Sequence, residues 1–347
     1  MGRVLIVGAT GQLGAAVLRR LVKSGHTVRA FVRPTSPRGS IEETGVELAF
    51  GDLRDAASVA AACREVETVV ATANAVVPRG SSSFEETEKL GYRHLIDASR
   101  GCGVKHLVFM SVPIMPRERE VTTFRLKREI EQEIRSSRIP STIFRGSLFM
   151  DDWFALVGSS IPLRGAELHT LRRGFWFSTG FLRLAGQSIE KRGLALVPGR
   201  GTARHAFVAL NDVAAFLEKA VERGGAGTEI DDIGGPEILS FNEVVAIFEK
   251  VLGRKIRAFH TPAGVYRALA VGLEPFSPAA SNLMAMSGLV AMADSPFPMA
   301  ETAKRFGVKL TSAEEFLREK LALGEDADSR SVSRAPDPSV EPGEPLE

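Results

Sequence analysis

Three glycines near the N-terminus are spaced as in a phosphate-binding turn. Gly8, Gly11 and Gly14 stand three residues apart, directly after the apolar run VLIV at residues 4–7. In this arrangement Gly8 permits a tight turn, Gly11 lets the backbone approach a pyrophosphate, and Gly14 lets a helix pack closely on the strand. A helix that begins here also directs free N–H groups at the anion. The spacing therefore predicts a dinucleotide site, although glycines also serve ordinary turns.

A cation stands where such folds usually carry an acid. Arg33 ends the second apolar run, residues 27–32, about twenty residues beyond the glycines. A carboxylate at that position accepts hydrogen bonds from a ribose 2′-hydroxyl, and arginine cannot accept them. Arginine instead forms forked, charge-assisted bonds with a 2′-phosphate. NADP(H) is therefore predicted over NAD(H), the alternative being a solvated arginine in a basic, proline-broken loop.

The elements that must position these residues alternate along the chain. Further strand-like runs, separated by helical patterns, occur at residues 46–50, 66–72, 106–110 and 141–144. This alternation predicts an α/β fold with a Rossmann-type, doubly wound parallel sheet. Ligands of such sheets bind beyond the carboxyl ends of the strands, so the loops after these runs are expected to line one crevice.

The expected cofactor site gathers residues from the glycine turn and from these loops. Asp52 is assigned to the adenine amino group, the alternative being a local turn next to Asp55, which is placed to cap a helix. The set predicted from these elements is Gly8, Thr10, Gly11, Gln12, Leu13, Gly14, Arg33, Asp52, Leu53, Ala71, Thr72 and Ala73.

Several motifs together resemble one protein family. They are GATGQLG at the glycines, VRP around Arg33, GDLRD at Asp52, FMSV at Ser111, Lys127 ahead of the run from residue 141, and the segments FVALNDVA and IGGPEILS. The chain resembles the atypical short-chain dehydrogenases/reductases that include NmrA-like proteins, in the branch related to the NADPH-binding accessory subunit of respiratory complex I. The resemblance covers residues 2–321. It implies a Rossmann-type domain followed by a smaller C-terminal substrate domain.

One catalytic element of that family is missing. Typical members carry a tyrosine four residues before the active-site lysine, so that the phenol delivers a proton as hydride moves. Thr123 stands at that position, and neither Tyr92 nor Tyr266 is followed by a lysine four residues later. Threonine has too high a pKa to replace a phenol, and a missing general acid costs about a hundredfold to ten-thousandfold in rate. Ordinary ketone reduction is therefore disfavoured.

Two residues remain as catalytic candidates. The resemblance assigns Lys127 to the nicotinamide ribose or to catalysis through water. The alternative is that Lys127 belongs to a solvated charge ladder with Glu131 and Arg135, at helical i, i+4 spacing. Ser111 ends its strand in the expected crevice, where it can bond a substrate carbonyl or the nicotinamide, or merely satisfy the local backbone.

Three segments follow from this organisation. Residues 1–150, with later segments near 206–233 completing the sheet, form the expected NADP(H)-binding domain. Residues 151–323 form the expected substrate or partner domain, which includes a long connection at 155–192 and a methionine- and proline-rich region at 259–297. Residues 324–347 are acidic and rich in serine and proline, which predicts a disordered tail.

Composition excludes several classes of function. The chain has 347 residues, a formal net charge of +2 and no dense basic block, so nucleic acid is not an expected partner. No apolar run is long enough to span a membrane. Two cysteines without metal-ligand spacing predict reduced thiols and no metal site, so a cytoplasmic protein is expected. The sequence leaves the oligomeric state open.

Three functions are compatible with these residues. The leading interpretation is NADPH-dependent reduction of a conjugated acceptor such as a quinone or enone, because delocalisation stabilises the anion without a strong protein acid. The partner is then a small hydrophobic or conjugated substrate. The alternatives are a non-catalytic NADP(H) sensor and an accessory assembly protein that binds cofactor mainly for stability.

Overall fold

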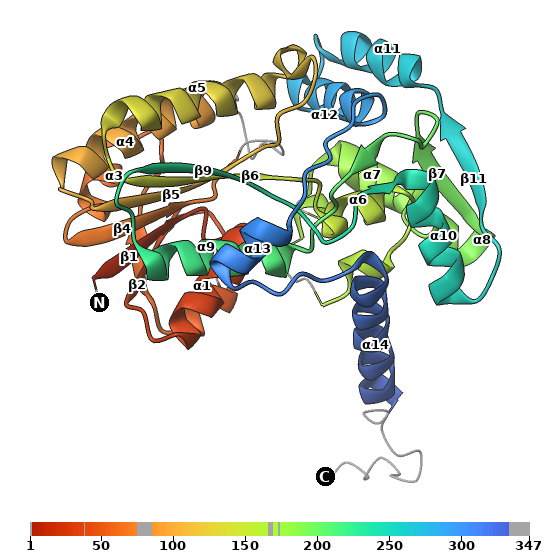
Figure 1. The fold of residues 1–347 in the computed structure, drawn as a ribbon, viewed down its shortest axis with the longest axis horizontal. Helices are drawn as coiled ribbons and strands as arrows, with labels where there is room; N and C mark the ends of the chain where they lie inside the picture. The colour runs from red at the N-terminus through yellow and green to blue at the C-terminus, as the bar shows by residue number, and fades with distance from the viewer. Residues whose placement is uncertain (1, 38, 75–84, 166–168, 173, 333–347) are drawn as a thin grey trace, which may run out of the picture.

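The chain builds a central parallel sheet with helices on both faces and a smaller C-terminal unit beside it (Figure 1). The structure is a computed structural model that describes residues 2–37, 39–74, 85–165, 169–172 and 174–332. The sheet strands are β1 (Arg3–Val7), β2 (Val28–Val32), β3 (Glu47–Phe50), β4 (Val66–Ala71), β5 (His106–Ser111), β6 (Ser141–Gly146) and β9 (Thr228–Ile233). The predicted α/β class and the Rossmann-type sheet are confirmed.

Strand order sets the position of the binding crevice. The seven strands lie in the order β3-β2-β1-β4-β5-β6-β9, and each neighbouring pair is parallel. The chain moves outward in one direction from β1 to β3 and in the other from β4 to β9. This reversal between β1 and β4 is the switch point of a doubly wound sheet, where loops leave in opposite directions and open a crevice.

Helices cover both faces of this sheet because its strands are apolar on both sides. One face carries α3 (Ala56–Ala62), α4 (Gly91–Gly101) and α5 (Thr122–Ser137). The other carries α1 (Gln12–Lys23), α9 (Leu210–Arg223) and α13 (Ala300–Phe306), as Figure 1 shows. The short α2 (Gly39–Glu42) precedes β3, the π-helical turn η1 (Glu85–Leu90) precedes α4, and the 3-10 turn η2 (Glu118–Glu120) precedes α5.

A second apolar core lies beyond the carboxyl ends of β5 and β6. The helices that build it are α6 (Met150–Leu156), α8 (Ser188–Arg192), α10 (Phe241–Leu252), α12 (Pro278–Val290) and α14 (Ala313–Val332), and the same unit also contains α7 (Trp176–Ala185) and α11 (Ala263–Leu273). Its strands form two pairs, β7 (Leu194–Pro198) with β11 (Arg257–Thr261) and β8 (Arg204–His205) with β10 (Leu239–Ser240). The 3-10 turns η3 (Ile161–Leu163) and η4 (Thr170–Arg172) fall in the long connection after α6.

Helix α14 corrects one expectation about the C-terminus. It continues to Val332, so residues 324–332, which composition assigned to a disordered tail, are helical. The rest of that predicted tail lies outside the described residues. Within the described chain, none of the helices combines the length and the apolar character that crossing a membrane requires.

Candidate functional site: a crevice at the switch point

A crevice opens where β1 and β4 end. Its lining comes from the turn after β1, the ends of β2 and β3, the loops after β4, β5 and β6, helix α5 and one residue of α12. The residues that carry the site are Gly8, Thr10, Gly11, Gln12, Leu13, Gly14, Arg33, Asp52, Leu53, Thr72, Ala73, Ser111, Thr123 and Lys127. The predicted site residues therefore lie together, with the exception of Ala71.

The glycine turn is closely packed against the next strand end. Gly8 has φ +94°, and a Cβ at that position would lie 2.7 Å from the backbone nitrogen of Ala73. A Cβ on Gly14 would overlap the carbonyl oxygen of Gly8. Only glycine therefore fits at either position, and the backbone stays accessible from the crevice.

Helix α1 begins directly behind this turn. Gly11 is its N-cap residue, and its first turn contains no acidic side chain that would repel an anion. The unpaired N–H groups of this turn and the helix dipole favour a negative charge in the crevice. Gln12 is partly engaged elsewhere, because its Oε1 accepts hydrogen bonds from the backbone N–H and the hydroxyl of Thr170 at 3.2 and 3.1 Å. The long connection after α6 thus folds back onto the glycine turn.

Arg33 lies half-buried at the edge of the crevice, after β2. Its charge reaches Asp52, whose pKa is lowered chiefly by the side-chain hydrogen bond from Arg54 and to a smaller extent by the charge of Arg33. Asp52 accepts from the backbone N–H, Nε and Nη2 of Arg54 at 2.9, 3.0 and 3.0 Å. Since a carboxylate has about four acceptor positions, Asp52 keeps little capacity for the adenine amino group. Asp55 caps α3 through the N–H of Ala57, as the spacing suggested.

Residues 71–73, at the end of β4, mainly hold neighbouring elements in place through hydrogen bonds. Ala71 is fully buried in the core below the sheet end and is not among the residues that line the crevice. Thr72 donates its hydroxyl to the carbonyl oxygen of Val7 at 3.1 Å and so fastens β4 to β1. Ala73 offers a carbonyl oxygen that accepts from two side chains, Tyr92 at 2.5 Å and Lys127 at 3.3 Å.

Lys127 is buried, with 3% of its surface exposed. Its Nζ lies 2.9 Å from Oε2 of Glu88 and about equally far from two aromatic rings, 4.9 Å from the centre of Tyr92 and 5.0 Å from that of Phe109. The predicted alternative of a solvated charge ladder is therefore wrong. The carboxylate and the ring faces compensate a cation that burial would otherwise penalise. Glu88 belongs to η1, and π-helical turns occur frequently at functional sites.

Neither tyrosine replaces the missing general acid. Tyr92 is next to Lys127, yet it is 1% exposed and donates its hydroxyl to Ala73. Burial, and then the charge of Glu88, raise the pKa of Tyr92 well above its usual value. Thr123 occupies the expected tyrosine position and is hydrogen-bonded to Asn282 through both its backbone N–H (3.1 Å) and its hydroxyl (2.6 Å). No phenol in the described chain faces the crevice.

Ser111 belongs to a charged network at the other end of the crevice. Its hydroxyl donates to Glu131 at 2.5 Å, and Glu131 also pairs with Arg128 and with Arg145. Arg128 further donates to the carbonyl oxygens of residues 112 and 113, both at 2.7 Å, and so holds the loop after β5. The Ser111 proton is thus directed at Glu131, and the serine oxygen accepts from Arg128 Nη1 at 3.3 Å, so toward the crevice the hydroxyl has no proton to donate and at most one acceptor position.

Several lining residues were not predicted as site residues. They include Val7, Phe31, Ser36, Arg54, Asn74, Thr87, Met110, Pro113, Phe124, Gly146, Ser147, Leu148, Asp152, Thr170, Leu210 and Met286. Most directly adjoin a strand end, so a search of the residues flanking each predicted strand would have included them. Met286 and Thr170 come from distant segments and carry no local signal. The aromatic residues after β6 lie in two environments. Phe149 and Trp153 line the crevice, whereas Phe154 is fully buried.

Strand order, glycine turn and crevice define a Rossmann-type fold with the geometry of a dinucleotide site. The chain belongs to the NmrA-like family, whose model matches residues 1–317.

Known relatives extend this likeness. The photosystem II assembly factor Ycf39 of Synechocystis sp. is 24% identical, over 91% of this chain and 90% of that protein. The NADPH-dependent quinone oxidoreductase of Escherichia coli in complex with NADPH is similar in structure, with a TM-score of 0.65, 19% identity and coverage of 91% of this chain and 99% of that one. The triphenylmethane reductase of Citrobacter sp. complexed with NADP(H) has a TM-score of 0.68, 20% identity and the same two coverages.

Proposed function

We propose that this chain is an NADPH-dependent reductase that transfers hydride to a conjugated acceptor such as a quinone or an enone. The observation that carries the proposal is the composition of the crevice. It combines a glycine turn beneath a helix N-terminus, an arginine at the end of β2 and a buried lysine, without a phenol. The structural likeness to a quinone oxidoreductase and to a triphenylmethane reductase supports the same reaction class.

The crevice fits a dinucleotide with a 2′-phosphate. Gly8 and Gly14 leave room that a Cβ would fill, so the backbone and the first turn of α1 would hold the pyrophosphate. Arg33 would bind the 2′-phosphate. Lys127 would donate to the nicotinamide ribose, and the oxygen of Ser111 would accept from the carboxamide N–H. When bound, NADPH supplies the hydride.

The surrounding side chains decide which acceptors can react. Tyr92 cannot protonate a substrate, since its proton is held by Ala73 and its pKa is raised. Thr123 donates its backbone N–H to Asn282 and accepts from it at the hydroxyl oxygen, and a threonine hydroxyl has too high a pKa to act as a general acid. An isolated ketone would therefore develop an alkoxide without a proton source, which is costly. A quinone or enone spreads that charge over its conjugated system and needs only the nearby positive charge of Lys127.

A panel of acceptors tests the proposal. NADPH consumption is measured with quinones, enones, azo dyes and simple aldehydes, in parallel with NADPH binding. Faster oxidation with the conjugated acceptors, and none with aldehydes, is expected. Tight NADPH binding without acceleration by any acceptor would refute the reductase.

A second candidate is a cofactor-binding assembly factor. It is favoured by the match to Ycf39 across nine-tenths of both chains. In that case the crevice binds NADP(H) for stability or sensing, and a protein partner is recovered only when the cofactor is present. In either case we place the protein in the cytoplasm, whose reducing conditions suit the free thiols of Cys63 and Cys102.

A further inference from the structure

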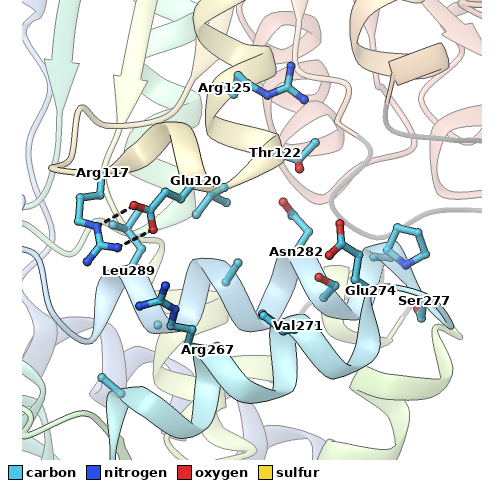
Figure 2. Close-up of a pocket in the computed structure, with 18 of the residues that line it drawn as sticks. Arg117, Glu120, Thr122, Arg125, Arg267, Val271, Glu274, Ser277, Asn282 and Leu289 are labelled. Atoms are coloured by element: carbon cyan, nitrogen blue, oxygen red, sulfur yellow. Dashed lines mark hydrogen bonds and ion pairs between the residues drawn. The ribbon is translucent and has the colours of Figure 1, made fainter.

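A second cavity, separate from the crevice, lies between the start of α5 and the α11–α12 helix pair. Its volume is about 1100 Å³, at the upper end of the range for small-molecule sites, which is about 300 to 1000 Å³. Thr122 and Arg125 of α5 and Asn282 and Leu289 of α12 line this space, and Figure 2 labels all four. Phe175 and Trp176, where α7 begins, close another side. None of the crevice residues is needed to form it.

The cavity and the crevice share one wall. On α12, Met286 lines the crevice, whereas Asn282, Ala285 and Leu289 line the second cavity. On α5, Thr123 lines the crevice and its neighbour Thr122 lines the cavity. Helices α5 and α12 therefore each present residues to both spaces, next to Thr123, which stands at the position of the missing tyrosine.

The inner end of the cavity is suited to an apolar occupant. Val121 and Leu289 are 2% and 6% exposed, and Ala285 is half-buried. The polar groups of Asn282 are already used, because its amide donates to Thr123 Oγ1 at 2.6 Å and its carbonyl oxygen accepts from the Thr123 N–H at 3.1 Å. Because these polar groups already have hydrogen-bond partners, a ligand does not have to satisfy them, and the inner end of the cavity offers it mainly dispersion contacts.

The outer end also carries charged side chains. Arg117 and Glu120 pair at 2.8 and 2.9 Å, and Figure 2 shows Arg267 beside them. Arg267 is exposed on α11, and Glu274 is exposed directly after that helix. Exposed apolar side chains line the cavity as well, among them Val271 and Phe276, so the lining is largely apolar from the buried end to the solvent side. An apolar lining of this kind fits a hydrocarbon chain.

One member of the shared wall can move without breaking a described hydrogen bond. Met286 is unbranched and flexible, and it contributes only apolar contacts, whereas Thr123 and Asn282 are fixed to each other. A chain attached to a ring in the crevice would pass beside Met286.

We infer that the second cavity holds the hydrocarbon tail of the acceptor whose conjugated ring is reduced in the crevice. The substrate class is then a long-tailed quinone or enone. This inference rests on the proposed function, and it adds a substrate feature that the reductase activity alone does not require.

A matched pair of acceptors tests it: tailless dimethoxymethylbenzoquinone and its decyl derivative, which share one ring. A tail taken out of water should raise kcat/KM by about tenfold or more. Ala285→Phe fills the inner end of the cavity and should abolish this preference. Leu269→Phe is the control, since Leu269 is 44% exposed on α11 and lies outside the cavity lining. It should keep the preference.

Fluorescence provides a second readout that does not depend on turnover. The chain has two tryptophans, of which Trp176 lines the cavity and Trp153 lines the crevice. Titration with bromodecanol, a contact quencher with an apolar chain, should give saturable quenching that Trp176→Phe removes. Circular dichroism of each variant verifies that it is folded.

The outcomes separate this inference from the proposed function. Equal kcat/KM for both quinones, together with quenching that does not saturate, would overturn the tail site while the reductase stands. If neither quinone is reduced, quinones are not the acceptor, and the panel with enones and azo dyes decides whether the reductase stands. Quenching then decides alone, because saturation still supports an apolar-chain site and its absence overturns it.

Discussion

Replacing Arg33 by glutamate should discriminate between the two nicotinamide cofactors. Arg33 lies half-buried at the crevice edge, beside Asp52 and Arg54. A guanidinium that binds a 2′-phosphate contributes charge-assisted hydrogen bonds of about 1.5 to 3 kcal/mol each. Because partial exposure screens this contribution, we expect a loss near the lower end, about 2 kcal/mol, which raises the Kd for NADPH about thirtyfold. Glutamate also adds repulsion, so this value is a minimum.

Titration of both cofactors measures this difference. Energy transfer from Trp153, which lines the crevice, to the dihydronicotinamide reports binding. The Kd for NADH should change by less than about threefold, because NADH has no 2′-phosphate for Arg33 to bind. Arg54→Gln is the control, since Arg54 is committed to Asp52 and should affect both cofactors alike. If Arg33→Glu weakens NADPH and NADH equally, the assignment of Arg33 to the 2′-phosphate is refuted.

Three further variants test other parts of the structure. Glu88→Gln leaves the Lys127 ammonium without its carboxylate and should lower the free energy of unfolding by about 3 to 5 kcal/mol. The double variant that also carries Lys127→Met should recover this loss. Denaturant unfolding that shows no recovery in the double variant would contradict the pairing. Gly14→Ala places a Cβ against the Gly8 carbonyl and should abolish NADPH binding, whereas unchanged affinity would show that the turn can relax. His205 is fully buried, with Nε2 donating to Val290 and Nδ1 accepting from Ser295, and burial lowers its pKa to about 4. Below pH 6.5 the unfolded chain takes up this proton before the folded one does. Stability from the neutral ring is therefore complete at pH 7 and falls by about 2 kcal/mol by pH 5. Burial also lowers the pKa of His106 to about 4, so urea unfolding should find the slope reduced in His205→Gln and not abolished.

Local patterns predicted the sheet and the glycine turn well. Strands such as β1 and β4 are continuous apolar runs, and their parallel order follows from the helices between them. Gly8 and Gly14 could be assigned because close backbone approach admits no other residue. Arg33 could be predicted to line the crevice because it directly follows β2, and the end of that strand fixes its position.

The environment of Lys127 could not be predicted in the same way. Its i, i+4 neighbours suggested a solvated helix face, yet residues from three other elements bury it: Glu88 of η1, Tyr92 of α4 and Phe109 of β5. These contacts depend on tertiary packing, which helical spacing does not encode. The burial of Ala71 follows a simpler rule, since a strand alternates its side chains between its two faces and this one faces the core.

A single-turnover experiment tests the central claim most directly. Protein saturated with NADPH is mixed rapidly with the decyl quinone, and the loss of NADPH absorbance is followed with protiated cofactor and with cofactor deuterated at the transferred position. The account predicts exponential oxidation, faster than for free NADPH with the same quinone and slowed by deuterium. Oxidation of bound NADPH at the rate of the free cofactor would contradict it.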